Sequence, residues 1–192
     1  MPAVEYLVSP EAVRLVHFRL LEEWRTAMNL VGPGPVDPHF DDCEAAVRRL
    51  DPRGRWADLG SGAGFPGIAF AAWHPEVTLT LVESRQKRAA FLEQVVREAG
   101  LPNASVLCGR VEDLPRAAFD GVIARAFAPP AQTLETALPL LVPGGQAVLL
   151  IAKEVPPEVR GFRKVRQEAY SRRDHARNLV VYERIQEAET SP

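Results

Sequence analysis

The stretch Asp58–Gly67, DLGSGAGFPG, places three glycines at every second position, beginning two residues after an acidic residue. Glycine lacks a Cβ atom, so a loop built on Gly60, Gly62 and Gly64 lets a ligand approach the main chain closely. Gly62, Gly64 and Gly67 also satisfy the G-x-G-x-x-G spacing of dinucleotide-binding loops, which is a weak signal by itself. The stretch therefore predicts a ligand-binding loop, and two classes of cofactor compete for it.

Asp58 separates the two classes. A nicotinamide or flavin dinucleotide would lay its pyrophosphate over this turn, where the carboxylate would repel it. S-adenosylmethionine carries an ammonium group and a sulfonium but no phosphate, so the same carboxylate attracts it. We therefore predict S-adenosylmethionine as the cofactor. A nicotinamide enzyme, or a nucleotide-binding module without transfer activity, is the alternative.

Two more acidic residues follow later apolar runs. Glu83 ends VTLTLVE, a position from which a carboxylate holds ribose hydroxyls in both cofactor classes. Glu112, in GRVEDL, is expected near the adenine, and helix capping by Glu112 and Asp113 is the alternative. The predicted cofactor contacts are Asp58, Gly60, Ser61, Gly62, Gly64, Phe65, Glu83, Ser84, Val111, Glu112 and Arg125.

The elements that must position these residues are short apolar runs alternating with helical segments. The runs RWADL, VTLTLVE, ASVLCG, FDGVIA and GQAVLLIA are separated by stretches with helical periodicity, including 68–73, 85–99 and 133–141. This alternation predicts a doubly wound α/β fold, a mostly parallel, Rossmann-like sheet with helices on both faces. KVRQEAYS and RNLVVYER have no helix between them, so they predict an antiparallel pair at one edge of a seven-stranded sheet.

Two helices are expected before the sheet. Ser9 is suited to cap the first of them, with Pro10 at its first position. Val13, Val16, Leu20 and Trp24 then repeat at three- and four-residue steps along one face, and the helix should end near Asn29. HFDDCEAAVRRL predicts the second helix, and both should pack beside or over the carboxyl edge of the sheet.

Composition limits the class of protein. The 192 residues are 46% hydrophobic and carry a net charge of −2, which fits one soluble domain without a global basic field. We expect residues 1–50 to form a helical extension on the acceptor side, 55–153 the donor-binding core and 154–192 the edge strands. Only two cysteines and no long apolar stretch are present, which predicts a cytoplasmic monomer without metal or membrane contact.

Several of these motifs together resemble one family. DLGSGAGFPGIAFA, VTLTLVESRQKRAAFLEQV, GRVEDL, FDGVIARAFA and LVPGGQAVLLIAK resemble the bacterial small-subunit ribosomal RNA guanine-N7 methyltransferases, the RsmG or GidB family. The agreement runs from about Trp56 to Lys153, and EEWRTAMNL, HFDDC and RNLVVYER extend it more weakly. The sequence departs from the family pattern at Val31-Gly32, at Cys43 and at Glu154, all on the acceptor side.

The resemblance implies methyl transfer from S-adenosylmethionine to N7 of a guanine in 16S ribosomal RNA, with that RNA or a precursor of the small subunit as partner. Guanine N7 has a free lone pair and loses no proton on methylation, so no general base is needed. Catalysis would then rest on positioning. A methyltransferase acting on a small molecule or a protein is the alternative, favoured by the sequence pI near 6.1.

Four residues are predicted to act on the acceptor side. Arg125 could bind the methionine carboxylate of the donor or guanine O6, His39 and Asn29 could reach the base, and Lys153 could meet a phosphate. Structural ion pairing or helix capping are the alternatives. Two aromatic residues, Phe65 and Phe127, could stack the base or pack in the core. Basic residues between Arg160 and Arg177, with Arg48, Arg49, Arg53 and Arg55, could contact the RNA backbone or be a solvated surface.

Overall fold

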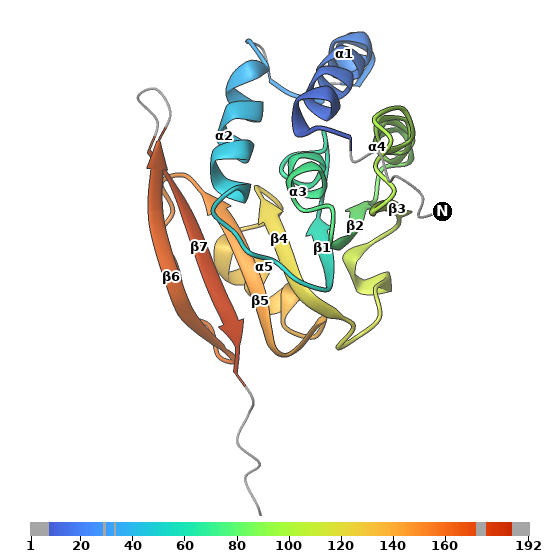
Figure 1. The fold of residues 1–192 in the computed structure, drawn as a ribbon. Helices are drawn as coiled ribbons and strands as arrows, with labels where there is room; N and C mark the ends of the chain where they lie inside the picture. The colour runs from blue at the N-terminus through green and yellow to red at the C-terminus, as the bar shows by residue number, and fades with distance from the viewer. Residues whose placement is uncertain (1–7, 29, 33, 172–175, 186–192) are drawn as a thin grey trace, which may run out of the picture.

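The computed structural model describes residues 8–28, 30–32, 34–171 and 176–185 (Figure 1). In chain order its elements are α1 (Pro10–Met28), α2 (Asp37–Val47), β1 (Arg55–Leu59), α3 (Gly67–Trp73), β2 (Thr78–Glu83), α4 (Gln86–Glu98), β3 (Ala104–Cys108), the 3-10 helix η1 (Val111–Asp113), β4 (Phe119–Arg125), α5 (Pro130–Ala137), β5 (Leu141–Ile151), β6 (Phe162–Ser171) and β7 (Ala176–Arg184).

One seven-stranded sheet organises these elements, in the order β3-β2-β1-β4-β5-β7-β6. The first five strands in this order are parallel, and β7 runs antiparallel to both β5 and β6. The order reverses between β1 and β4, so their carboxyl ends form the switch point where ligands bind in such sheets. The predicted doubly wound fold with an antiparallel edge pair is confirmed.

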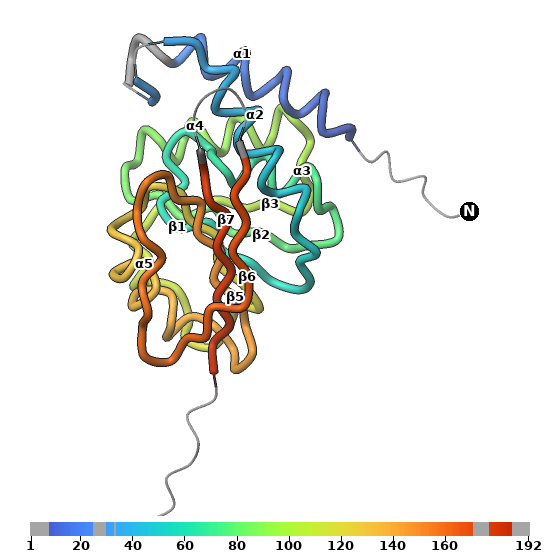
Figure 2. Tube along the Cα trace, turned by 90° about the vertical axis from the view of Figure 1, so that its left-hand side faces the viewer, coloured from blue at the N-terminus to red at the C-terminus, as the bar shows by residue number. Residues whose placement is uncertain are grey.

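Helices cover both faces of the sheet because the strands are apolar on both sides. Trp56 and Ile123 belong to the core shared with α1 to α4. Ala57 and Leu59, on the opposite side of β1, belong to a second core with Leu134 of α5. Figure 2, viewed from the β6 edge, shows α5 on one side of the sheet and α2 and α3 on the other.

The N-terminal helices lie near the carboxyl ends of the parallel strands (Figure 1). The Ser9 hydroxyl accepts the Ala12 amide at 3.2 Å, which confirms the predicted cap of α1. Val13 and Leu20 are buried as the periodicity predicts, and so is His17 between them. Helix α1 packs on α3 and α4, while α2 packs on α3 and β6. The two N-terminal helices thus reach both the core and the edge strand.

Two predicted boundaries were wrong. The helix expected at 133–141 is α5, which begins at Pro130 and ends at Ala137, and Leu141 already belongs to β5. Leu141 is apolar enough for either element, and its pairing with Phe119 of β4 decides for the strand. The helix expected at 39–50 is α2, which ends at Val47. The amides of Arg49 and Leu50 donate to the carbonyls of Ala46 and Val47, three residues back, so the α-helical pattern stops there.

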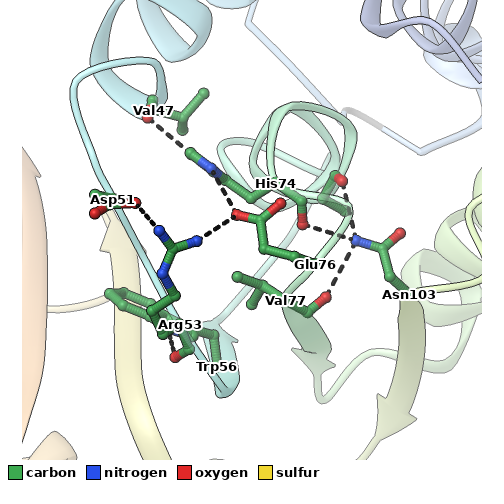
Figure 3. A network of polar contacts seen from close by, with 9 residues as sticks. Val47, Asp51, Arg53, Trp56, His74, Glu76, Val77 and Asn103 are labelled. Carbon is green, nitrogen blue, oxygen red and sulfur yellow. Dashed lines mark hydrogen bonds and ion pairs between the residues drawn. The ribbon is translucent and has the colours of Figure 1, made fainter. Parts of the chain in front are cut away.

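A polar network ties the opposite, amino end of the sheet together (Figure 3). His74 Nε2 lies 3.0 Å from the Val47 carbonyl, and its Nδ1 lies 3.6 Å from Glu76. Arg53 pairs with Asp51 at 2.9 Å and approaches Glu76 at 3.8 Å. The network joins the end of α2 to the turn after α3, well away from the glycine loop.

Asn103 lies in the same region, and its contacts lead to a testable prediction (Figure 3). Its side-chain amide donates to the carbonyls of Ala71, His74 and Val77 at 3.0, 3.2 and 3.2 Å. Asn103→Asp replaces the donor by a carboxylate facing carbonyl oxygens, so we expect a loss of about 2 kcal/mol or more in the free energy of unfolding, measured by urea denaturation. Asn178→Asp is the control, because among the described residues the Asn178 amide makes one bond, of 3.5 Å, to the Ala152 carbonyl. Equal denaturation midpoints for the two variants would contradict the prediction.

Candidate functional site

The glycine loop after β1 has a backbone that requires glycine. Gly60, Gly62 and Gly64 have φ angles of 69°, 56° and 89°, in the left-handed region that side chains disfavour. A Cβ atom on Gly60 would also lie 2.7 Å from the ring of Phe127. The group that lies close to the main chain at Gly60 in this structure is the Phe127 ring, and the approach of a ligand stays a prediction.

Hydrogen bonds fasten the loop to the end of β2. The Ser61 amide donates to the Val82 carbonyl at 2.9 Å, and the Gly62 amide donates to Glu83 Oε2 at 3.1 Å. The other carboxylate oxygen of Glu83 accepts the Arg85 amide at 2.8 Å. Glu83 thus shapes the loop as well as bordering the cavity beside it.

Asp58 lies beneath the loop, with only 1% of its surface exposed. Neither carboxylate oxygen accepts a hydrogen bond from the described residues, and a Cβ atom on Gly67 would lie 2.4 Å from Oδ2. Burial raises the pKa of Asp58 to about 7, although the nearby Ser61 hydroxyl and Gly67 amide act in the opposite direction. The fold therefore holds a buried carboxylate that accepts no hydrogen bond from the described residues, although the Ser61 and Gly67 donors lie near it.

A cavity of about 860 Å³ opens beside the loop at the carboxyl ends of β1 to β4. Of the predicted cofactor contacts, it is lined by Gly60, Glu83, Ser84, Val111 and Glu112. The sequence analysis missed three arginines in the same wall, Arg85, Arg88 and Arg110, which follow their strands without any distinguishing spacing.

The two acidic residues of GRVEDL have separate places. Asp113 Oδ2 accepts the Arg110 amide at 2.7 Å, so the capping role considered for this pair falls to Asp113. Glu112 is exposed and borders the cavity. Its expected place near the adenine of the donor stays a prediction.

A second group of side chains lies where α2, the glycine loop, β4 and β7 meet; its members, called the Asp42 cluster below, are His39, Asp42, Phe65, Arg125 and Arg177. Asp42 Oδ2 is buried and lies 3.5 Å from Arg125 Nη1 and 3.7 Å from Arg177 Nε, without a hydrogen bond from the described residues. The Arg125 guanidinium lies over the Phe65 ring, 5.0 Å from its centroid. Arg125 thus has both an ion pair and an aromatic contact.

His39 faces the same cluster. Its ring lies 5.7 Å from that of Phe65, centroid to centroid. Burial lowers the pKa of His39, and the positive charges of Arg125 and Arg177 lower it further, whereas Asp42 opposes them. His39 is therefore neutral near pH 7. The sequence analysis missed Asp42, whose only signal was its place in HFDDC, and it did not single out Arg177 from the basic residues.

Ala126, the residue directly after β4, explains how the side chains on either side of it reach different parts of the site. It has a φ angle of 56°, which is rare for a residue other than glycine and costs about 1 kcal/mol or more. Arg125 before it faces α2, and Phe127 after it lies over Gly60. The strained turn therefore serves both the cavity and the Asp42 cluster.

Other predicted residues lie elsewhere. Asn29 is outside the described residues, and Lys153 is exposed in the bend after β5. The described members of the basic set between Arg160 and Arg177 do not form one surface. Arg163 pairs with Glu183 at 3.0 Å near the amino end of the sheet, whereas Arg177 enters β7 at the carboxyl end. Their separation follows from the antiparallel hairpin, which turns between them.

The arginines before β1 also lie away from the cavity. Arg53 belongs to the polar network at the amino end, and Arg55 begins β1 there. Arg49 approaches Glu168 at 3.8 Å, and Arg48 lies over the Trp73 ring at 4.5 Å. These contacts tie the connection after α2 to its neighbours rather than to the Asp42 cluster.

Comparison with known proteins identifies the family. A family model described as rRNA small subunit methyltransferase G, GidB, matches residues 13–183. The chain belongs to this family. Ribosomal RNA small subunit methyltransferase G of Paracoccus denitrificans is 39% identical over 158 residues, 79% of this chain and 82% of that protein. The protein of the same name from Brevibacillus brevis is 35% identical over 191 residues, 88% of this chain and 80% of that protein.

Solved structures agree in fold with this GidB family member. A variant of MtNAS in complex with S-adenosylmethionine has a TM-score of 0.62 at 16% identity, covering 93% of this chain and 77% of that chain. TYW2 of M. jannaschii in complex with AdoMet has a TM-score of 0.58 at 15% identity, covering 77% and 76%. The resemblance inferred from the motifs and the Rossmann-like methyltransferase fold are both confirmed.

The site fits the donor S-adenosylmethionine. The cavity beside the loop is large enough for an adenosine-sized ligand, since small-molecule sites span about 300–1,000 Å³. Glu83 and Glu112 give it acceptors for hydroxyl and amino groups. Asp58 is 1% exposed beneath the loop and is not among the residues that line the cavity. Of the three acidic residues expected to contact the donor, Glu83 and Glu112 border this cavity.

Among the described residues, no helix is both long and apolar enough to cross a membrane. The same part of the chain contains no group of three or more His, Cys, Asp or Glu side chains arranged to hold a metal ion.

Proposed function

We propose that this protein transfers a methyl group from S-adenosylmethionine to N7 of a guanine in small-subunit ribosomal RNA. Family membership supports the reaction class and the RNA substrate. One observation of the structure carries the assignment of the site: Phe65 belongs to the glycine loop and also contacts both Arg125 and His39 of the Asp42 cluster. Donor loop and acceptor side therefore meet at one side chain.

On the donor side, the main chain of the glycine loop provides most of the binding surface for the donor. When bound, the donor supplies an electrophilic methyl group on its sulfonium. Glu83 is assigned to the ribose, Glu112 to the adenine and Asp58 to the positive charge, with Gly60, Ser84 and Val111 shaping the wall. Ser61, Gly62 and Gly64 keep the loop in place. These roles require a preformed loop, which its hydrogen bonds to β2 provide.

On the acceptor side, no group has to remove a proton. Guanine N7 attacks with its own lone pair, so the residues of the Asp42 cluster orient the base and stabilise charge. We assign Arg125 to guanine O6, because its planar guanidinium lies over Phe65 on the side facing α2. A neutral His39 beside it avoids adding a further positive charge where the methylated base becomes cationic.

The proposal is tested by the nucleoside inventory of ribosomal RNA. Small-subunit RNA from cells lacking the gene should lose one 7-methylguanosine, detected by mass spectrometry of nuclease digests. Restoring the gene should restore the nucleoside. An unchanged inventory in the deletion strain would refute the proposed function.

The same proposal includes the cellular setting and organisation. We place the reaction in the cytoplasm, where ribosomal subunits are assembled. The described residues of a single chain line the donor cavity, which supports action as a monomer. The division into a helical acceptor-side extension, residues 1–50, a donor-binding core, 55–153, and edge strands, 154–192, follows the distribution of these contacts.

A further inference from the structure

His17 of α1 is a buried histidine in contact with the glycine loop. Its side chain is 1% exposed, and its Nε2 lies 2.7 Å from the carbonyl oxygen of Ala63. The loop also approaches the ring at the next residue, because a Cβ atom on Gly64 would come within 3.0 Å of Nε2. Helix α1 thus touches the main chain of the loop through one side chain.

The protonation state of His17 follows from its partner. A carbonyl oxygen only accepts hydrogen bonds, so Nε2 must carry the proton and donate it to Ala63. Burial lowers the pKa of His17 to about 4, against the opposing effect of the Ala63 bond. The imidazole is therefore neutral at physiological pH and holds one fixed tautomer.

Aromatic rings fix the orientation of this imidazole. The rings of Phe40 in α2 and Phe65 in the loop each lie 4.9 Å from it, and that of Phe91 in α4 lies 6.1 Å away. His17 therefore lies between three segments, α2, the glycine loop and α4, which belong to both sides of the site. A shift of α1 would move the donor N–H relative to the loop carbonyl.

We propose that His17 is a positioning residue that fixes the donor loop onto α1, so that the N-terminal helix sets the affinity for the methyl donor. The inference rests on the proposed function, in which this loop holds S-adenosylmethionine. His17 touches neither substrate directly and acts through the Ala63 carbonyl. The competing explanation is that His17 only fills space in the core.

The chain offers a matched control in His74. This second histidine is also buried, at 8% exposure, and its Nε2 also lies 3.0 Å from a main-chain carbonyl, that of Val47. It belongs to the amino-end network of Figure 3, away from the loop. His74→Phe therefore removes the same kind of hydrogen bond without touching the donor site.

The experiment compares His17→Phe, His17→Gln and His74→Phe with the wild-type protein. Phe keeps the aromatic packing and removes the N–H, whereas the side-chain amide of Gln can replace the donor at a similar reach. Affinity for S-adenosylmethionine and its demethylated product is measured by titration calorimetry, together with the melting temperature. If His17→Phe does not fold, His17→Met takes its place, since a flexible apolar side chain adapts to such a site.

We expect about tenfold weaker donor binding in His17→Phe, rescue to within about twofold in His17→Gln and unchanged binding in His74→Phe. The KM for the donor should rise in His17→Phe while kcat at saturating donor changes little. The inference would be overturned, and the proposed function left standing, by either of two results. One is wild-type donor affinity in a destabilised His17→Phe, and the other is an equal loss of donor affinity in His74→Phe. Failure of the wild-type protein to bind the donor would overturn the proposed function and the inference with it.

Discussion

Replacement of Asp58 by Asn should stabilise the donor-free protein and weaken its binding of S-adenosylmethionine. The pKa of Asp58 is raised from 3.8 to about 7 by burial, so ionisation at higher pH destabilises the fold by about 4 kcal/mol. Asn removes this cost but leaves an amide without partners, and the net gain should be about 2 kcal/mol near pH 8. Loss of the negative charge should weaken donor binding about tenfold or more.

The sign of the pH dependence distinguishes this cause from a packing effect. A raised carboxyl pKa gives a stability contribution that is complete below about pH 4 and is lost as the pH rises through about 7. The advantage of Asp58→Asn should therefore be largest above neutrality and should become a net loss of about 2 kcal/mol toward pH 4, where the cost of the amide remains. Melting temperatures measured across this range check the expectation.

His17 produces the opposite trend in the same range. Its pKa is lowered from 6.5 to about 4, so between these pH values the unfolded chain binds a proton at His17 and the folded chain does not. Stability then falls as the pH drops from 6.5 toward 4. The two groups offset each other in the wild-type protein between about pH 4 and 6.5, and Asp58→Asn should reveal the slope due to His17.

Donor binding should release a proton from Asp58. Near pH 7 about half of the donor-free molecules carry that proton, and a bound cation favours the ionised carboxylate. Calorimetry in two buffers of different ionisation enthalpy should give about 0.5 proton released per donor, relative to Asp58→Asn. Asp120→Asn is the control, because Asp120 caps the Arg55 amide at the amino end. Equal proton release in wild-type protein and Asp58→Asn would show that the carboxylate does not respond to the donor.

Arg125→Met should reduce kcat/KM for ribosomal RNA by about 100-fold, while the affinity for S-adenosylmethionine stays within about threefold. Arg125 pairs with Asp42, lies over Phe65 and is not among the residues that line the donor cavity. Methionine keeps much of the volume but removes the donors assigned to guanine O6. Rates of methyl transfer into small-subunit RNA at saturating donor measure the effect.

The two roles that the sequence leaves open for Arg125 predict different results. If the guanidinium binds the methionine carboxylate of the donor, donor affinity falls together with the rate, and the assignment to guanine is wrong. Arg116→Met is the matched control, since Arg116 lies in a separate cavity with Leu138 and Arg184 at the amino end of the sheet. It should leave both quantities unchanged.

Local sequence patterns predicted much of this structure because they report local physics. The alternation of apolar runs with helical periodicity reflects strands buried on both faces, and that pattern placed β1 to β5 correctly. The glycine loop was also recognisable, since left-handed φ angles leave a direct mark on residue type. Leu141 shows the limit, because its apolar character suits a helix end and a strand equally.

The Asp42 cluster could not be assembled from the sequence. Its members come from α2, the loop, β4 and β7, and only the packing of α2 against α3 and β6 brings Asp42 toward Arg177. The grouping of the basic residues between Arg160 and Arg177 into one surface failed for the same reason. Arg163 and Arg177 are close in sequence, but the hairpin directs them to opposite ends of the sheet. His17 gave no local signal, because its importance depends on the carbonyl it reaches.

Phe65 places a constraint on any redesign of this enzyme. Its ring is covered by α1 and α2 residues and by Arg125, yet its main chain belongs to the loop between β1 and α3. A chimera that imports the two N-terminal helices from another methyltransferase would leave this ring facing foreign neighbours. Exchange of base preference therefore requires the helices and the loop to be transplanted together.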